Sequence, residues 1–263
     1  MNDSLYIANI SYKIENMIKN NEKINNYILS LKNNNQFPKY LEYIDSFLAE
    51  NGLSGCAFIN LNTNEIIIGF AGTNFEKIDI LDNFSLEKLT KYQNAISEGI
   101  KDLEIDYNIL FKKLDYKKYI KPAIKFIEKL EKNNLKINLI TGHSLGGAIA
   151  DYIGTFKNIN VITYNSAPLF FENENNKIKE EYIFNLKKYN QKKYRFRSEN
   201  DVLNNVSNLL GAVYNGKEII FKNCGIHFLE DFFNQELFKY YDYILNTDFN
   251  KLNNKIIIDI NEK

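Results

Sequence analysis

The sequence predicts an α/β fold, with a mainly parallel central sheet, helices on both of its faces and a helical N-terminal segment. Through the middle of the 263-residue chain, segments with a β-type pattern alternate with segments of helical period, which is typical of a parallel sheet. Only three prolines occur and no Gly/Ser-rich stretch marks a linker, so we expect a single domain over residues 1–263. Within it, we expect a helical segment over 1–52 and a core over 55–245.

The separate elements are predicted from the spacing of apolar residues and from Gly, Pro and Asn breaks. Helices are expected over 4–31, 38–50, 92–133 with interruptions near Asp115 and Pro122, 145–156 and 228–245. Strands are expected over 55–61, 65–70, 136–141, 159–164, 193–197 and 218–221, the first two forming a hairpin. A polar loop with a short helix is expected over 172–192.

The composition excludes several classes of function. Lys plus Arg and Asp plus Glu number 33 each, so no basic surface for nucleic acid is expected. No apolar run approaches the ~18 residues of a membrane span, and the N-terminus lacks an apolar signal core. We therefore expect a cytoplasmic protein, although a leaderless export route would leave no trace in the sequence. Cys56 and Cys224 are too few for a disulfide framework and are expected to be free thiols.

The run Thr141-Gly142-His143-Ser144-Leu145-Gly146-Gly147 contains the pattern G-x-S-x-G of a nucleophile elbow. A serine hydroxyl is a poor nucleophile until a base takes its proton, so its Oγ must stand clear of the backbone and meet a histidine. The pattern lies between the predicted strand over 136–141 and the predicted helix over 145–156, which is the context that an elbow requires. Ser144 is the candidate nucleophile; the alternative is an ordinary Gly/Ser turn.

The candidate base follows by elimination, because the chain has two histidines. His143 lies inside the elbow, beside Ser144 rather than facing it. His227 lies between the end of a predicted strand and the start of a predicted helix, where an imidazole can reach across the edge of the sheet. We therefore expect His227 to be the base.

The histidine needs a carboxylate that fixes its tautomer, and the chain order Ser, Asp/Glu, His places this acid between the other two. Asp201 follows a predicted strand, on the carboxyl side of the sheet where the sites of open α/β sheets gather. Glu199 is its chief rival. Asp151 faces outward from the predicted elbow helix and is expected to be structural, and the acidic residues of 172–181 are expected to be solvated. Asp201 is the favoured acid.

An oxyanion hole needs two hydrogen-bond donors. The backbone N–H of Leu145, the residue after the nucleophile, is the first. The second is expected from residues 70–73, a strand end in which Gly72 allows the backbone to approach closely. The Thr73 hydroxyl can add a donor there. The alternative is a strand that simply ends at a Gly turn.

Four segments together resemble the class 3 lipases and the related bacterial lipase-like α/β-hydrolases, over about residues 55–230. Phe70-Ala71-Gly72-Thr73 resembles the family's F-R-G-T oxyanion segment, and 141–147 its T-G-H-S-L-G-G elbow. Asn165-Ser166-Ala167-Pro168 resembles the segment that ends the next strand, and Asn200-Asp201-Val202 the segment that carries the acid, with His227 as the late histidine. The resemblance implies an α/β-hydrolase fold. It also implies a catalytic triad of Ser144, Asp201 and His227, and an oxyanion hole with Thr73 and Leu145 as donors.

The sequence also departs from that family. Ala71 stands where the family usually has an arginine, and the chain has no tryptophan. These departures weaken an assignment as a triglyceride lipase more than they weaken the fold. Residues 74–90 are rich in Phe, Ile and Leu without a clean period, so they fit either a covering lid or a permanently buried helix.

The expected function is that of a serine hydrolase that cleaves carboxylic esters through an acyl-enzyme, with acyl lipids as substrates, in the manner of a lipase or phospholipase. The chemistry requires no metal and no organic cofactor. The expected partners are a lipid or small ester substrate and transient contact with a membrane surface. Two alternatives stay open: a soluble esterase or thioesterase with a small substrate, and a binding module that keeps the fold without catalysis.

Overall fold

The structure is a computed structural model that describes residues 2–72, 116–172, 177–209 and 211–260. Its helices are α1 (Asp3–Lys19), α2 (Ile24–Asn33), α4 (Tyr116–Lys132), α5 (Leu145–Lys157), α6 (Lys177–Lys188), α7 (Val202–Leu209) and α8 (Gln235–Asn246), with the short 3-10 helices η3 (Leu229–Phe233) and η4 (Phe249–Lys251). Its strands are β1 (Leu41–Leu48), β2 (Ser54–Asn60), β3 (Glu65–Phe70), β4 (Ile137–His143), β5 (Asn160–Tyr164), β6 (Phe170–Phe171), β7 (Lys193–Ser198), β8 (Ala212–Val213), β9 (Lys217–Lys222) and β10 (Lys255–Asp259).

Within the described ranges, eight strands form one sheet in the order β1-β2-β3-β4-β5-β7-β9-β10. The pairs β1–β2 and β2–β3 are antiparallel. Each later pair, from β3–β4 to β9–β10, is parallel. This arrangement confirms the predicted fold class, and the hairpin of β2 and β3 is where the sequence places it.

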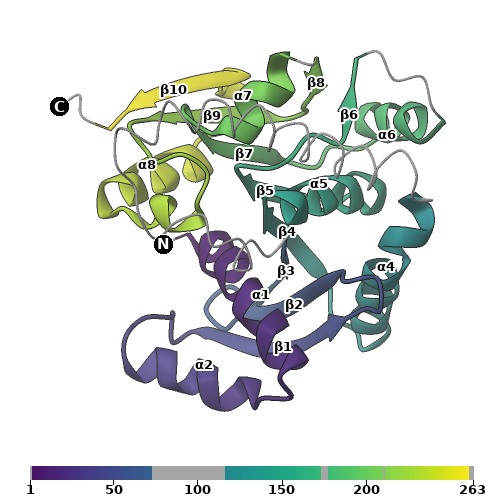
Figure 1. Cartoon of the computed structure of the whole chain (residues 1–263), viewed down its shortest axis with the longest axis vertical. Helices are drawn as coiled ribbons and strands as arrows, with labels where there is room; N and C mark the ends of the chain where they lie inside the picture. Colours follow the sequence, from purple (N-terminus) through teal and green to yellow (C-terminus); the bar gives the residue numbers. More distant parts are fainter. Residues whose placement is uncertain (1, 73–115, 173–176, 210, 261–263) are drawn as a thin grey trace, which may run out of the picture.

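Helices cover both faces of the sheet, with α4, α5 and α6 on one side and α1, α2 and α8 on the other (Figure 1). The alternation along β3 shows why: Ile66, Ile68 and Phe70 join the core with α4 and α5, whereas Ile67 joins the core with α1 and α2. Successive side chains of a strand point to opposite faces, so a strand covered on both sides is apolar throughout. The predicted strand over 65–70 shows this pattern, whereas the one over 193–197 carries arginines on one face.

The parallel strands place the candidate residues at one edge of the sheet. β4, β5, β7 and β9 run in the same direction, so their carboxyl ends meet at that edge. Ser144 follows β4, Asn165 follows β5, Asp201 follows β7 and His227 follows β9. Sites of open α/β sheets gather at this edge, and the order of the strands therefore brings distant parts of the chain together.

The prediction of a helix over residues 38–50 is wrong, because this stretch contains the edge strand β1. The segment 1–52 is therefore not helical throughout. The register of β1 against β2 shifts between Tyr43 and Asp45, so Ile44 is an extra residue. A bulge of this kind interrupts the alternation of apolar residues along a strand. The spacing of Leu41, Ile44 and Leu48 then imitates a helical period.

The C-terminal elements also differ from the prediction. The single helix expected over 228–245 is divided into η3 and α8 at Asn234, whose side chain accepts a hydrogen bond from the backbone N–H of Glu236 and caps α8. β10 extends the sheet beyond residue 245, and α7 was not predicted. The interruption expected at Pro122 is absent from the described helix α4, which runs through it. The apolar side of α4, with Ala123 and Ile127 fully buried, offsets the backbone hydrogen bond that proline cannot make.

Gly69→Ala is expected to destabilise the packing of α1 against β3. A Cβ added at Gly69 would lie 2.7 Å from the backbone oxygen of Ile7 and 2.8 Å from its Cγ2. Overpacking of this kind lowers the free energy of unfolding by about 1–3 kcal/mol, which chemical denaturation measures. Thr63→Ala, in the exposed turn between β2 and β3, is the matched control and should change this free energy by less than ~0.5 kcal/mol. Equal stability of the two variants would contradict the packing described here.

Candidate active site

Ser144 occupies a strained turn between β4 and α5. Its φ of 53° and ψ of −126° lie in a region that costs a residue with a side chain of order 1–3 kcal/mol. Neighbouring backbone holds the turn: the N–H of Ser144 donates to the oxygen of Tyr164 at 3.2 Å, and the N–H of Ala167 donates to the oxygen of Ser144 at 3.0 Å. The end of β5 therefore supports the conformation that presents Oγ.

The two glycines of the pattern are required by close approach of the backbone. A Cβ on Gly146 would overlap the carbonyl oxygen of Phe70 and lie 2.8 Å from the carbonyl carbon of Ala71. A Cβ on Gly142 would overlap the backbone of Gly146 and lie 2.8 Å from the nitrogen of Gly147. Both side chains would therefore push α5 away from the strands.

The structure brings Ser144, His227 and Asp201 into contact, in that order. His227 Nε2 lies 3.3 Å from Ser144 Oγ, and His227 Nδ1 lies 3.0 Å from Asp201 Oδ1. Asp201 is fully buried, whereas Glu199, the rival acid, is exposed. The backbone N–H of Glu199 donates to the oxygen of Phe221. The geometry therefore places Asp201 behind the imidazole of His227.

Both oxygens of the Asp201 carboxylate accept hydrogen bonds. Oδ1 accepts from the backbone N–H of Asn204 at 3.3 Å, and Oδ2 accepts from the Asn204 side-chain amide. Asp201 thus acts as the N-cap of α7. The Asn204 amide is itself held, because its Oδ1 accepts from the guanidinium of Arg195 and from the Tyr214 hydroxyl, the latter at 2.8 Å.

A buried cationic network lies behind Asn204. Arg195 stacks on Tyr214, with its Cζ 3.3 Å from the ring centroid, and its guanidinium pairs with Glu218. Arg197 Nε also contacts Glu218, at 3.0 Å. Burial lowers the pKa of Arg195. Sequence reasoning missed this network; its signal is a pair of arginines two positions apart in an otherwise buried strand, which places both on one face.

The loop that carries His227 is fastened at several points. Ser198 Oγ donates to the backbone oxygen of Gly225 at 2.5 Å, and the N–H of Ile226 donates to Asp231 Oδ2 at 3.2 Å. Burial raises the pKa of the Asp231 carboxyl. These bonds fix the backbone of Gly225 and Ile226, so the loop restricts the position of the His227 imidazole.

The oxyanion side of the site is partly described. Leu145 is the first residue of α5, and a residue in this position has an N–H without an intrahelical acceptor. A Cβ added at Gly72 would lie 2.7 Å from the oxygen of His143 and 3.3 Å from the nitrogen of Gly146, so the end of β3 lies beside the start of α5. Thr73 and the segment 74–90 lie outside the described residues.

His143 has partners other than Ser144 at both of its ring nitrogens. Nδ1 lies 2.9 Å from the Tyr12 hydroxyl, and Nε2 lies 2.7 Å from the backbone oxygen of His227. A carbonyl oxygen only accepts, so Nε2 carries the proton and Nδ1 accepts from Tyr12. Burial, and then the neighbouring His227, lowers the pKa of His143 to about 3.

This pKa predicts a pH dependence of stability. The unfolded chain takes up a proton at the ordinary histidine pKa of 6.5, whereas the folded chain takes it up only at about 3. The contribution of His143 to stability is therefore fully present above pH 6.5 and is lost as the pH falls toward 3, with a slope of up to ~1.4 kcal/mol per pH unit. Unfolding free energies measured below neutral pH should fall less steeply for His143→Gln than for the wild type. Parallel curves would contradict a neutral, buried His143.

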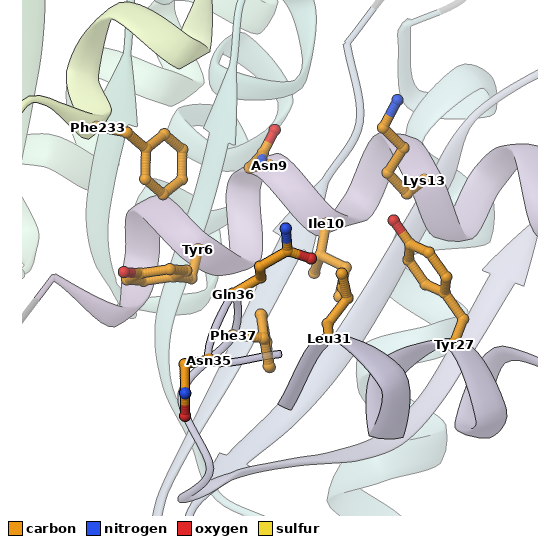
Figure 2. A pocket seen from close by; sticks show the side chains of 10 residues that line it. All are labelled: Tyr6, Asn9, Ile10, Lys13, Tyr27, Leu31, Asn35, Gln36, Phe37 and Phe233. Carbon is orange, nitrogen blue, oxygen red and sulfur yellow. The ribbon is translucent and has the colours of Figure 1, made fainter. Parts of the chain in front are cut away.

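Other features of the described residues lie apart from Ser144. A groove of about 370 Å³ opens between α1, α2 and the end of η3, as Figure 2 shows. Its lining is aromatic and aliphatic with a polar rim: Tyr6, Asn9, Ile10, Lys13, Tyr27, Leu31, Asn35, Gln36, Phe37 and Phe233. None of the three candidate catalytic residues lines it.

Two sequence expectations concern groups outside the candidate site. Cys56 and Cys224 are buried free thiols, as expected. Asp151 has the expected structural role but not the expected outward orientation, because its carboxylate pairs with the buried Lys193 of β7 and accepts a hydrogen bond from the hydroxyl of the buried Tyr182 of α6. Within the described ranges, no His, Cys, Asp and Glu side chains gather as a metal site, and no helix has the length and apolar character to cross a membrane.

The chain has limited similarity to known proteins. Residues 87–210, less than half of the chain, match an uncharacterised protein family (UPF0227); this range holds Ser144 and Asp201 and ends before His227. No curated protein matches the sequence.

Similar solved structures include three fungal lipases. Lipase II from Rhizopus niveus is 18% identical over 82% of this chain and 77% of its own, with a TM-score of 0.46. The Lip2 lipase from Yarrowia lipolytica is 18% identical over 83% of this chain and 76% of its own, with a TM-score of 0.48. A Rhizomucor miehei lipase in complex with its propeptide is 13% identical over 70% of this chain and 57% of its own, with a TM-score of 0.41.

Proposed function

We propose that this chain is a serine hydrolase that cleaves carboxylic esters, with Ser144 as nucleophile, His227 as general base and Asp201 as the acid that orients it. The observation that carries the proposal is the continuous series of contacts from Ser144 Oγ through the His227 ring to Asp201, at 3.3 and 3.0 Å. A nucleophile, a base and a third group that orients the base are the parts that acyl transfer needs.

In the acylation step, Ser144 Oγ attacks the ester carbonyl carbon while its proton passes to His227 Nε2. The carbonyl oxygen becomes an oxyanion, which the N–H of Leu145 stabilises together with a donor from the end of β3, with Thr73 as the proposed source. The positive end of the α5 dipole adds to this stabilisation. The intermediate then collapses: the C–O bond to the alcohol breaks, and His227 gives the alcohol its proton.

In the deacylation step, water takes the place of the alcohol. His227 accepts a proton from water, the resulting hydroxide attacks the acyl carbon, and Ser144 leaves with the proton returned by the imidazole. Throughout, Asp201 Oδ1 accepts a hydrogen bond from the Nδ1–H of His227, which leaves Nε2 to exchange protons and stabilises the imidazolium. The hydrogen bonds that Asn204 donates keep the carboxylate in place.

The surroundings of His227 favour an acyl lipid over a small polar ester. The residues on either side of it, Ile226 and Phe228, are large, apolar and 42% and 41% exposed. Exposed apolar side chains grouped at a site indicate contact with an apolar ligand. We therefore propose that an acyl chain lies along these side chains when its ester carbonyl is at Ser144.

Rates on p-nitrophenyl acetate, octanoate and palmitate test this preference. The kcat/KM of the wild type should rise from acetate to octanoate, because each buried methylene adds about 0.8 kcal/mol of binding. Ile226→Ser with Phe228→Ser should lose most of this gain and keep the rate on acetate. Leu209→Ser, an exposed apolar residue on α7, is the matched control and should behave like the wild type.

The outcomes separate the competing functions. Equal kcat/KM for all three esters would favour a soluble esterase or thioesterase with a small substrate. Hydrolysis of none of them, together with no covalent labelling by a fluorophosphonate, would favour a binding module on the same fold.

A further inference from the structure

One histidine in the site is not used by the proposed chemistry. His143 precedes the nucleophile, is 6% exposed, and both of its ring nitrogens have partners. With Nδ1 and Nε2 both occupied, this ring has no nitrogen left to serve Ser144 as a base. Its ring centroid lies 4.9 Å from that of His227, so it belongs to the site without taking part in proton transfer to the substrate.

The bond from Nε2 reaches the backbone of the candidate base itself. His143 Nε2–H donates to the carbonyl oxygen of His227 at 2.7 Å. The two residues are 84 positions apart in the sequence, and the bond ties the end of β4 to the loop after β9. Asp231 and Ser198 hold the residues before His227, whereas the bond from His143 holds His227 at its own peptide group.

Tyr12 of α1 lies at the other nitrogen of His143 and can stabilise the tautomer that makes this bond. The His227 carbonyl can only accept, so Nε2 carries the proton, and the Tyr12 hydroxyl, 2.9 Å from Nδ1, then donates to that nitrogen. The backbone oxygen of His143 is a second acceptor for this hydroxyl, farther away at 3.4 Å. The same hydroxyl lies against the backbone of Gly72: a Cβ added at Gly72 would lie 2.5 Å from the Tyr12 oxygen. Tyr12 therefore contacts the proposed oxyanion segment at the end of β3 as well as the elbow.

We propose that His143 is a positioning residue that holds His227 through the Nε2–H···O bond, and that Tyr12 fixes the tautomer of His143 that makes this bond. The proposal rests on the proposed function, because it assigns to these residues the placement of the base. The N-terminal helix α1 is then part of the site: the Tyr12 hydroxyl contacts the oxyanion segment and the elbow, and through the ring of His143 it is linked to the loop of His227.

A pair of amide substitutions tests the bond to His227. The side-chain amide of Gln ends near the place of the imidazole Nε2, whereas that of Asn ends near the place of Nδ1. His143→Gln therefore keeps a donor for the His227 carbonyl, and His143→Asn does not. On p-nitrophenyl octanoate, we expect His143→Gln to stay within about threefold of wild-type kcat. We expect His143→Asn to lose about 10²-fold in kcat with KM nearly unchanged, as for a misplaced catalytic group.

Tyr12→Phe tests the role of the tautomer and alters a single oxygen atom. In the wild-type background it should lower kcat about tenfold, the effect of one net hydrogen bond. In the His143→Gln background it should change kcat by less than about twofold, because an amide nitrogen is a donor without any help from Tyr12. A merely structural role for Tyr12 would lower kcat equally in both backgrounds, and this result would overturn the proposal.

The remaining outcomes are distinct from failure of the proposed function. If Ser144→Ala kept wild-type hydrolysis, the proposed function itself would fail. If Ser144→Ala were inactive while His143→Asn kept wild-type kcat, or while His143→Gln were as impaired as His143→Asn, only the positioning proposal would fail. Circular dichroism shows whether each variant is folded. If either His143 variant unfolds, Tyr12→Phe decides the question: a lower kcat with KM nearly unchanged supports the proposal, and an unchanged kcat overturns it.

Discussion

Ser144→Ala is expected to abolish ester hydrolysis and covalent labelling while the protein stays folded. Oγ is the only atom removed, and its contact in the site is with His227 Nε2 at 3.3 Å. By analogy with other serine hydrolases, the loss in kcat should be of order 10⁶-fold. The backbone bonds from Ser144 to Tyr164 and Ala167 do not involve the side chain, so the thermal midpoint should shift by only a few degrees.

A matched control for this variant is Ser166→Ala. Ser166 is a buried serine on the loop after β5, and its Oγ donates to the backbone oxygen of Ala167. It should keep turnover within about threefold, since it has no proposed part in the chemistry. His227→Ala should be as inactive as Ser144→Ala, and the double variant should be little worse than either, because the members act as a unit. Hydrolysis at the wild-type rate by Ser144→Ala would falsify the assignment of the nucleophile.

Asp201→Asn is expected to lower kcat by up to about 10⁴-fold with little change in KM. The Asp201 carboxylate accepts from His227 at Oδ1 and from the Asn204 amide at Oδ2. An Asn side chain has one oxygen for these two donors, so either His227 or Asn204 would face an N–H group. With its NH2 group toward His227, the Asn side chain no longer holds the proton on Nδ1, and the backbone N–H of Asn204, which donates to the same Oδ1, loses its acceptor. With its oxygen in that place, the neutral amide keeps the cap of α7 but does not stabilise the imidazolium as a carboxylate does.

Glu199→Gln is the matched control for the acid. The Glu199 side chain is exposed, and its replacement should leave kcat within about twofold of the wild type. Measurement of both variants on the same ester settles the assignment. If Glu199→Gln were the inactive variant and Asp201→Asn were near the wild type, the acid would be Glu199, and the geometry of the site would differ from that described.

The residues of the candidate site were predictable because each follows a feature that is local in sequence. Ser144 lies in a pattern whose glycines are required by the close approach of β3 and α5. With two histidines in the chain, His227 followed by elimination. Asp201 followed from its place after a strand, since parallel strands end at a common edge.

The support around the site was not predictable, because it depends on contacts between distant segments. Tyr12 lies 131 positions from His143, and nothing in the pattern of α1 distinguishes it from other half-buried aromatic residues. Asn204 acts on Asp201 from the first turn of α7, a short helix that apolar spacing alone did not reveal. In the same way, β1 was mistaken for a helix because its bulge at Ile44 is a property of its pairing with β2.

Peptide mapping of the protein after reaction with a fluorophosphonate tests the central claim most directly. Such a reagent forms a covalent bond with a serine only where a base activates its hydroxyl. We expect one adduct, on the peptide that contains Ser144, formed rapidly by the wild type and not by His227→Ala. An adduct on another residue, or an adduct on Ser144 that forms equally fast without His227, would contradict the account.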